Sequence, residues 1–299
     1  MFLQYRRFFS FMKSYLSLVK FSHTIFALPF ALLGMSLGFK ISQTSFDITL
    51  FLKILVCMIS ARNAAMAFNR YIDREIDKKN PRTASREIPS NIISSKNALF
   101  FIIINCIIFC ATTFFINKLC FYLSPIALFV ILGYSYTKRF TFLCHLILGI
   151  GLGLAPIGAF IAVTNHFDIL PILYGFAVIF WVGGFDVIYA LQDSNFDKEN
   201  DLYSIPSKFG VDNAIKISMV FHILSASCII LAGYLAYFKY NLGLGILFII
   251  ANILFLFLLF YQQMIVREKD MSKINLAFFT TNGIASVLFG ALYIIDLFN

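Results

Sequence analysis

Long runs of apolar residues, separated by short polar segments, cover most of this 299-residue chain. The runs are each about 20 residues long, which suffices for a helix to cross a hydrocarbon core of roughly 30 Å. They lack the strict alternation of membrane β-strands. We therefore expect an all-α integral membrane protein, a bundle of nine transmembrane helices in one membrane-embedded domain, residues 1–299. The predicted helices are near residues 15–39, 46–71, 97–117, 119–137, 141–163, 169–191, 214–237, 241–266 and 274–297.

Composition supports the membrane class. Hydrophobic residues make up 60% of the chain and charged residues only 13%, whereas soluble domains carry about 25% charged residues. The net charge of +9 does not point to nucleic acid, because the basic residues follow the membrane topology. With the helices above, all but four of the Lys and Arg residues fall on one side of the membrane; the exceptions are Lys40, Lys53, Lys118 and Lys239.

The positive-inside rule assigns the basic side to the cytoplasm. We therefore expect a multi-pass protein of the cell inner (cytoplasmic) membrane, with the N-terminus on the cytoplasmic side. The two most acidic loops fall on that side as well, and each is long enough to form short lid-like helices over a site. Neither nucleic acid nor an obligate protein partner is implied.

The first acidic loop follows the second predicted helix. Asn69, Asp73 and Asp77 recur at every fourth residue, so on a helix they lie on one face. Arg62 falls close to the same stripe. One helix would thus direct several oxygen ligands toward one point.

The second acidic loop repeats this spacing after the sixth predicted helix. Asp193, Asp197 and Asp201 are again four residues apart, and on a helix Asp186 and Tyr189 share their face. A carboxylate such as Asp186 inside a membrane helix costs roughly 2.5 to 3.5 kcal/mol at the bilayer centre, so such residues usually have a function. Two acidic faces predict one shared site between them.

Carboxylate oxygens suit Mg²⁺, which keeps water and phosphate ligands in its shell. A substrate diphosphate could supply the missing ligands, with Arg62, Lys138 and either Arg82 or Arg86 neutralising the remaining charge, so that it becomes a good leaving group. If the leaving carbon is allylic, an apolar and aromatic chamber would stabilise the resulting cation and exclude water. Tyr134 lies one helical turn before Lys138, on the same side as the acidic loops.

These motifs resemble those of a known family. The segments NRYIDREID with RTASREIPS, Tyr134 with Lys138, and YALQDSNFDKEND with LYSIP are similar to the paired aspartate motifs and the Tyr-x-x-x-Lys motif of the UbiA superfamily of intramembrane prenyltransferases. The resemblance covers nearly the whole chain. It implies an enzyme, a polyprenyltransferase, that uses Mg²⁺ to transfer a polyprenyl group from its diphosphate to an aromatic acceptor in quinone biosynthesis.

The resemblance also implies roles for individual residues. Asn69, which would bind substrate, belongs with Asp73 and Asp77 to the first metal-diphosphate motif, and Asp193 and Asp197 form the second. Arg62 and Lys138 would contact the diphosphate, and Tyr134 would orient the allylic end. Asp186 or Tyr189 would orient or deprotonate the acceptor.

The sequence departs from the usual pattern of the family at two places. Many members have Asn-Asp where this chain has Asn69-Arg70, and Arg-Pro-Leu-Pro-Ser-Gly where it has the segment from Arg86 to Asn91. The wording GFDVIYALQD followed by LYSIP is most similar to the 4-hydroxybenzoate polyprenyltransferase branch. This branch implies a 4-hydroxybenzoate-type acceptor in ubiquinone biosynthesis, and a dihydroxynaphthoate-type acceptor in menaquinone biosynthesis is the alternative.

Two other readings remain. A heme O synthase of the same superfamily would act on a porphyrin, but the short loops and the absence of further histidines argue against it. A membrane transporter for a phosphorylated solute would also place acidic residues between repeated helices. A transporter would not need Mg²⁺ and would not consume a polyprenyl diphosphate.

Overall fold

The computed structural model describes residues 14–19, 26–267 and 280–299, and these residues form helices and connecting turns with no β-strand. The first and last predicted helices fall partly on residues 20–25 and 274–279, which lie outside the described ranges. The helices are α2 (Leu28–Ser42), α3 (Ile48–Ile72), α4 (Arg74–Lys79), α5 (Ser95–Phe114), α6 (Lys118–Thr137), α7 (Cys144–Thr164), α8 (Ile169–Ala190), η2 (Leu191–Asp193), α9 (Ser194–Glu199), α10 (Ile205–Phe238), α11 (Ile246–Arg267) and α12 (Asn282–Phe298).

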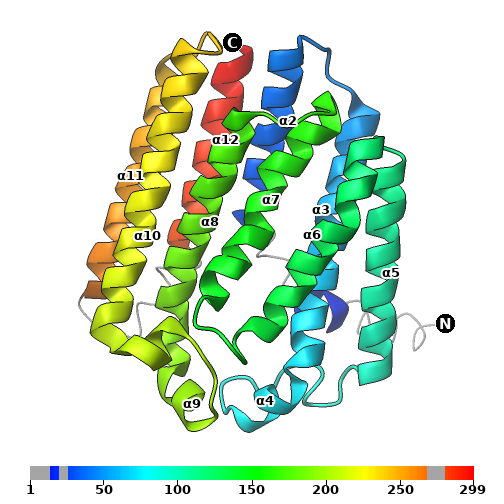
Figure 1. Ribbon diagram of the computed structural model, residues 1–299, viewed down its shortest axis with the longest axis vertical. Helices are drawn as coiled ribbons and strands as arrows, with labels where there is room; N and C mark the ends of the chain where they lie inside the picture. Colours follow the sequence, from blue (N-terminus) through cyan, green and yellow to red (C-terminus); the bar gives the residue numbers. More distant parts are fainter. Residues whose placement is uncertain (1–13, 20–25, 268–279) are drawn as a thin grey trace, which may run out of the picture.

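The long helices run side by side in one bundle (Figure 1). Helix α8 lies between α7 and α10 and packs extensively against both, and α2 packs on the other side of α7. The two short helices α4 and α9 lie next to each other at one end of the bundle, beyond the ends of the long helices (Figure 1). The chain thus brings both acidic segments to the same end.

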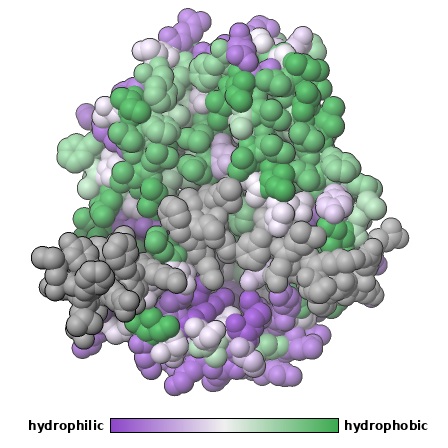
Figure 2. Space-filling model, turned by 180° about the vertical axis from the view of Figure 1, so that it is seen from behind, coloured by the Kyte–Doolittle hydropathy of each residue, from purple (hydrophilic) through white to green (hydrophobic). Residues whose placement is uncertain are grey.

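The outer surface of the bundle is apolar. Figure 2 shows a broad hydrophobic band across one face, with hydrophilic residues gathered at the end that holds α4 and α9. Large side chains such as Phe100 and Phe129 are exposed within this surface, as expected where lipid replaces water. Among the described residues, seven helices are long and apolar enough to span a membrane, and α2 and α12 are shorter apolar helices. The protein is therefore an all-α, multi-pass membrane protein, and the count of nine transmembrane helices stays a prediction.

Local sequence signals fix the helix ends. The side chain of Asp47 accepts hydrogen bonds from the backbone at Thr49 and Leu50 and caps the start of α3, which satisfies N–H groups that have no partner within the helix. The seventh helix, predicted near residues 214–237, is preceded by a short helical segment. Ser204 forms a capping box with Ser207, so that α10 begins at Ile205. Gly210 then interrupts the helix with φ 76°, ψ 167°, a conformation that glycine adopts readily.

Aromatic packing fills the centre of the bundle. Trp181 of α8 is fully buried against Phe30 and Phe255, and its Nε1 donates a hydrogen bond to Oδ1 of Asn282, 2.9 Å away. Such contacts join α2, α8, α11 and α12 through large apolar area with the indole N–H satisfied. This core holds α8, the helix that leads into the second acidic segment.

Glycines on two sides of α7 have different surroundings. A Cβ atom at Gly149 would lie 2.4 Å from the backbone oxygen of Ile179, so this side of α7 packs directly against α8, as small residues allow in membrane bundles. A Cβ atom at Gly158 would meet no other atom within 4 Å, and Gly158 borders a cavity, as does Gly151. One side of α7 therefore fixes the helix packing, and another faces open space.

Candidate active site

The first acidic segment keeps its helical spacing across the junction of α3 and α4. Helix α3 ends at Ile72, but the backbone N–H of Asp73 still bonds to the oxygen of Asn69 (3.0 Å), and that of Asp77 to the oxygen of Asp73 (2.7 Å). The side-chain amide of Asn69 donates to Oδ2 of Asp73 at 3.3 Å. The structure thus brings Asn69 and Asp73 together on one face, as the spacing predicts.

Asp73 is the buried centre of a cluster of charges. Its side chain is 2% exposed, and its Oδ2 lies 2.7 Å from Nζ of Lys138, the residue that follows α6. Arg139 lies 3.2 Å from the other carboxylate oxygen and also donates to the backbone oxygen of Ile72. Lys138 was expected here. Arg139 was not, because a basic residue at a helix end usually serves only as a topological anchor.

Asp77 is paired within its own loop. Arg86 donates from one nitrogen to both of its carboxylate oxygens, at 2.8 and 2.9 Å. Thr83 donates its hydroxyl to the backbone oxygen of Asp77 at 3.1 Å. These contacts fold the loop after α4 back onto the helix, so that its basic side chains point toward the acids.

The departures from the family pattern are paired with each other. Arg70 and Glu87 form a salt bridge of 3.3 Å, and their side chains are only 5% and 11% exposed. Asn91, where the pattern has Gly, has φ 60°, and Asn tolerates this left-handed conformation better than most residues. The buried charges that these two departures introduce are therefore paired with each other.

Asp193 joins the two acidic segments. The guanidinium of Arg82 binds both of its oxygens, with Nε 2.9 Å from Oδ1, and the amide of Asn80 donates to Oδ1 at 3.1 Å. Arg82 also donates to the hydroxyl of Tyr189 at 3.0 Å, with its guanidinium 5.3 Å from the ring centre. Burial works to lower the pKa of Arg82, but its hydrogen bonds to Asp193 and Tyr189 and the nearby charge of Asp193 together raise the pKa, so the guanidinium stays charged. Sequence reasoning missed Asn80.

The second acidic segment is not one continuous α-helix. Helix α8 ends at Ala190, the 3₁₀ turn η2 carries Asp193, and α9 carries Asp197. Oδ2 of Asp197 accepts a hydrogen bond of 2.9 Å from Ser204. Asp201 lies exposed beyond α9 with φ 52°. Asp193 thus contacts the loop of the first segment, Asp197 is bound to Ser204 in its own loop, and Asp201 lies exposed after α9.

Asp186 has a partner that the sequence did not reveal. Its Oδ2 lies 2.7 Å from Nδ1 of His145, in the first turn of α7. Tyr189 and Asp193 both contact Arg82 instead, so the residues expected on one face divide between two partners. No spacing links residues 145 and 186, so only the packing of α7 against α8 could show the pair.

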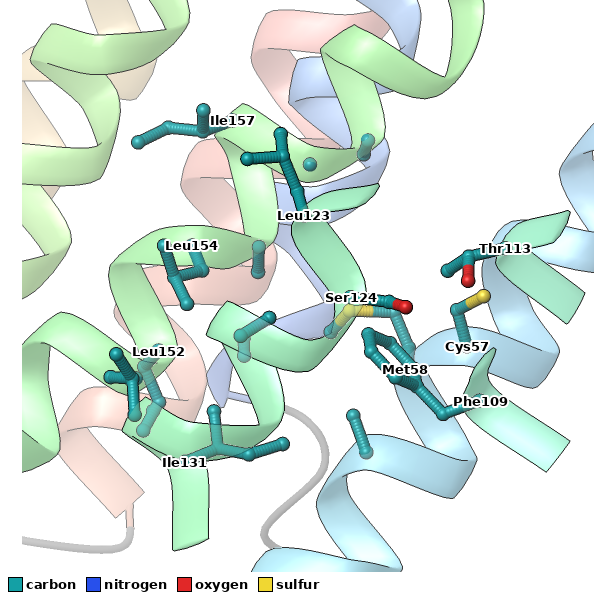
Figure 3. Close-up of a pocket in the computed structure, with 18 of the residues that line it drawn as sticks. Cys57, Met58, Phe109, Thr113, Leu123, Ser124, Ile131, Leu152, Leu154 and Ile157 are labelled. Carbon is teal, nitrogen blue, oxygen red and sulfur yellow. The ribbon is translucent and has the colours of Figure 1, made fainter. Parts of the chain in front are cut away.

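An apolar cavity of about 320 Å³ opens beside the charged cluster. Residues of α3, α5, α6 and α7 line it, and Figure 3 shows Leu152 and Ile157 on one side with Cys57 on the other. Arg62 and Tyr134 are among its polar members, together with Thr113 and Ser124, and Tyr134 lies within electrostatic range of Asp73 and Asp186. Nε of Arg62 is buried and has no hydrogen-bond partner among the described residues. The cavity therefore approaches the charged cluster through Tyr134.

The donor set fits Mg²⁺. Asn80 and Arg82, in the loop after the first acidic segment, contact Asp193 of the second, and the carboxylates of both segments are hard oxygen ligands. Within the described ranges, no three His, Cys, Asp or Glu side chains come together closely enough to hold an ion by themselves. This suits an ion that takes part of its shell from water and substrate phosphate, as Mg²⁺ usually does.

Fold and site together define an all-α membrane enzyme with an acidic and basic cluster at one end of an apolar cavity. The model of the UbiA prenyltransferase family matches residues 27–284. The chain belongs to this family, and the predicted enzyme class, a prenyltransferase, is confirmed.

Relatives with known names and structures agree. The 4-hydroxybenzoate octaprenyltransferase of Francisella tularensis subsp. novicida (strain U112) is 29% identical over 200 residues, which cover 67% of this chain and 70% of the relative. The apo structure of a UbiA homolog from Aeropyrum pernix K1 is 31% identical, with a TM-score of 0.81 over 92% of this chain and 98% of the other. A UbiA homolog from Archaeoglobus fulgidus, solved bound to GPP and Mg²⁺, has a TM-score of 0.72 at 20% identity and covers 96% of this chain and 100% of its own. Mg²⁺, the cofactor expected from the sequence, is thus the ion bound in a protein of the same fold.

Proposed function

We propose that this protein transfers a polyprenyl group from polyprenyl diphosphate to an aromatic acceptor of the 4-hydroxybenzoate type, in a Mg²⁺-dependent reaction of quinone biosynthesis. The observation that carries the proposal is the gathering of the Asp73–Lys138 and Asp193–Arg82 pairs at one end of the bundle, where Asp73 is within electrostatic range of Tyr134, a residue that lines the apolar cavity. A diphosphate with a long hydrocarbon tail needs this combination.

The charged cluster would hold the diphosphate. Asp73, Asp77, Asp193 and Asp197 would hold Mg²⁺, which when bound neutralises the diphosphate and makes it a better leaving group. The cations that now neutralise these acids would bind the phosphate oxygens instead, because Arg and Lys form strong charge-assisted hydrogen bonds with phosphate. These cations are Lys138, Arg82 and Arg86.

The cavity would hold the hydrocarbon tail. Its lining is apolar apart from a few groups such as Arg62 and Tyr134. Arg62 would use its buried guanidinium on the diphosphate, with Asn69 contributing at the first motif, and Tyr134 would orient the allylic end. An apolar wall and an aromatic ring stabilise a developing allylic cation and keep water from trapping it.

The aromatic acceptor would bind on the side of Asp186 and Tyr189. The names of relatives support 4-hydroxybenzoate as the acceptor class, and a dihydroxynaphthoate, as in menaquinone biosynthesis, is the alternative. We further propose that the α4 and α9 end faces the cytoplasm at the inner membrane, since most of the Lys and Arg residues gather there, and that residues 1–299 act as one domain, which the family match over 27–284 supports.

The test is incubation of purified protein in vesicles with a labelled polyprenyl diphosphate and either 4-hydroxybenzoate or 1,4-dihydroxy-2-naphthoate. We expect prenylated product from one acceptor, loss of product with EDTA, and recovery when Mg²⁺ is added back. Product that forms equally well in EDTA would contradict the Mg²⁺ assignment.

The same vesicles separate catalysis from transport. A transporter for a phosphorylated solute would move labelled solute across the bilayer without consuming polyprenyl diphosphate. Flux without any prenylated product from either acceptor would overturn the proposed function.

A further inference from the structure

His145 lies where three helices meet. His145 is in the first turn of α7, and its side chain is 3% exposed. Its Nδ1 is 2.7 Å from Oδ2 of Asp186 on α8, and its Nε2 is 3.2 Å from the backbone nitrogen of Ile205, the first residue of α10. Both ring nitrogens of a buried histidine are therefore engaged by different helices.

The backbone contact settles the direction of the hydrogen bonds in the neutral ring. A backbone N–H can only donate, so Nε2 accepts from Ile205, and the proton of the ring is on Nδ1, from which it is donated to Asp186. This bond fixes the orientation of the carboxylate. Asp186 keeps 23% of its side chain exposed while His145 is buried, so Asp186 is the member of the pair that a substrate can reach.

The contact with Ile205 also ties the pair to the second acidic segment. Residues 203–205 are docked by three consecutive contacts: Tyr203 N donates to the oxygen of Lys138 (2.7 Å), Ser204 Oγ donates to Asp197 (2.9 Å), and Ile205 N donates to His145 (3.2 Å). One short segment thus touches the diphosphate side through Asp197 and Lys138 and the Asp186 side through His145.

We propose that His145 is a positioning residue for the aromatic acceptor. It holds Asp186 so that the carboxylate accepts a hydrogen bond from the hydroxyl of a phenolic acceptor, and it keeps Asp186 in register with the segment that follows the second acidic motif. This inference rests on the proposed function. It gives His145, which lies outside all the acidic and basic motifs, a role on the acceptor side of the site.

Two substitutions separate the two hydrogen bonds of His145. In His145→Asn the amide nitrogen takes a position near Nδ1, so the donor to Asp186 is kept. In His145→Gln the amide group reaches only the region of Nε2, so the contact with Ile205 is kept and the donor to Asp186 is lost. We expect His145→Gln to raise the KM for the acceptor roughly tenfold or more, since a hydrogen bond to a charged group is lost. The KM for polyprenyl diphosphate should stay within about twofold, and His145→Asn should keep the acceptor KM within about threefold.

The matched control is His166→Gln, since His166 is exposed in the turn between α7 and α8 and contacts Thr164 and the ring of Phe160, away from the acidic segments. It should leave both KM values unchanged. Equal effects of Asn and Gln at position 145, or a rise in the diphosphate KM as large as that of the acceptor KM, would overturn the inference. Thermal unfolding of each purified variant identifies any loss of folding.

The wild type distinguishes this failure from failure of the proposed function. If wild-type protein prenylates no phenolic acceptor while it still binds a polyprenyl diphosphate analogue with Mg²⁺, the acceptor assignment fails, and this inference fails with it. If the wild type is active and His145→Gln matches it, only the role of His145 is refuted.

Discussion

Arg82 and Asp193 are in direct contact although 111 residues separate them, with Nε 2.9 Å from Oδ1. This contact connects the loop after α4 to the turn before α9, so the two acidic segments are held together by protein side chains alone. Tyr189 holds the same guanidinium from a second side at 3.0 Å. The site is therefore already assembled around groups that a phosphate could displace.

Loss of Arg82 should weaken binding of the diphosphate. We expect Arg82→Ala to raise the KM for polyprenyl diphosphate roughly tenfold or more, because a bidentate, charge-assisted contact disappears. The KM of Arg82→Lys should lie between those of the wild type and Arg82→Ala, since lysine keeps the charge but not the planar fork. Steady-state kinetics in vesicles measures this. Arg74→Ala is the control, because Arg74 at the same end pairs with exposed Glu75 and stacks on Tyr71; a similar rise there would contradict a specific role.

Loss of one motif carboxylate should abolish turnover. Asp73→Asn and Asp193→Asn keep the shape of the side chain but remove the charge that a divalent ion needs, so we expect kcat to fall roughly 100-fold or more. Product formation at saturating substrate and Mg²⁺ measures this. Glu75→Gln is the matched control, since Glu75 follows Asp73 closely but its side chain is 77% exposed. Near-normal turnover in either Asp variant would refute the shared-metal hypothesis.

The Arg70–Glu87 pair should matter for stability rather than for chemistry. Removing one partner leaves a buried charge unpaired, so Arg70→Ala or Glu87→Ala should each lower the free energy of unfolding by about 3 to 5 kcal/mol. The double variant should lose less than the sum, because no unpaired charge remains. Thermal unfolding in detergent ranks the stabilities of the wild type, the two single variants and the double variant. Additive losses would show that the two side chains do not interact.

Substitutions at two glycines of α7 should have different effects, one on stability and the other on substrate binding. Gly149→Ala places a methyl group 2.4 Å from the oxygen of Ile179, so the helices must separate and stability should fall by about 1 to 3 kcal/mol. Gly158→Leu meets nothing within 4 Å of its Cβ, so the fold should persist. The new side chain would occupy the cavity and raise the KM for long polyprenyl diphosphates more than for short ones. Kinetics with diphosphates of increasing length measures this. Equal effects at all lengths would contradict binding of the hydrocarbon tail in this cavity.

The sequence predicted the features that depend on spacing along one helix. The four-residue interval of Asn69, Asp73 and Asp77 survives the junction of α3 and α4, and the apolar runs became the long helices. Boundaries were less predictable. Residues 205–213 are not strongly apolar, so the start of α10 depended on the Ser204 cap and the break at Gly210, which run length does not reveal.

Partners on different helices could not be read from the sequence. His145, Asn80 and Arg139 each meet a motif residue only because separate helices converge at one end of the bundle. The assignments of Asp73, Asp77, Asp193 and Asp197 to metal remain predictions, since they concern a bound state. The Arg70–Glu87 pair shows how two departures from a familiar motif can explain each other once the loop is folded.

The unequal surroundings of the glycines on α7 have a consequence for evolution. Where this helix touches α8, the neighbouring backbone leaves no freedom to vary. Toward the cavity, single substitutions can change the shape of the cavity without disturbing the packing of α7 against α8. Single substitutions on this side of α7 therefore allow the cavity to adapt to a different isoprenoid during evolution while the fold is conserved.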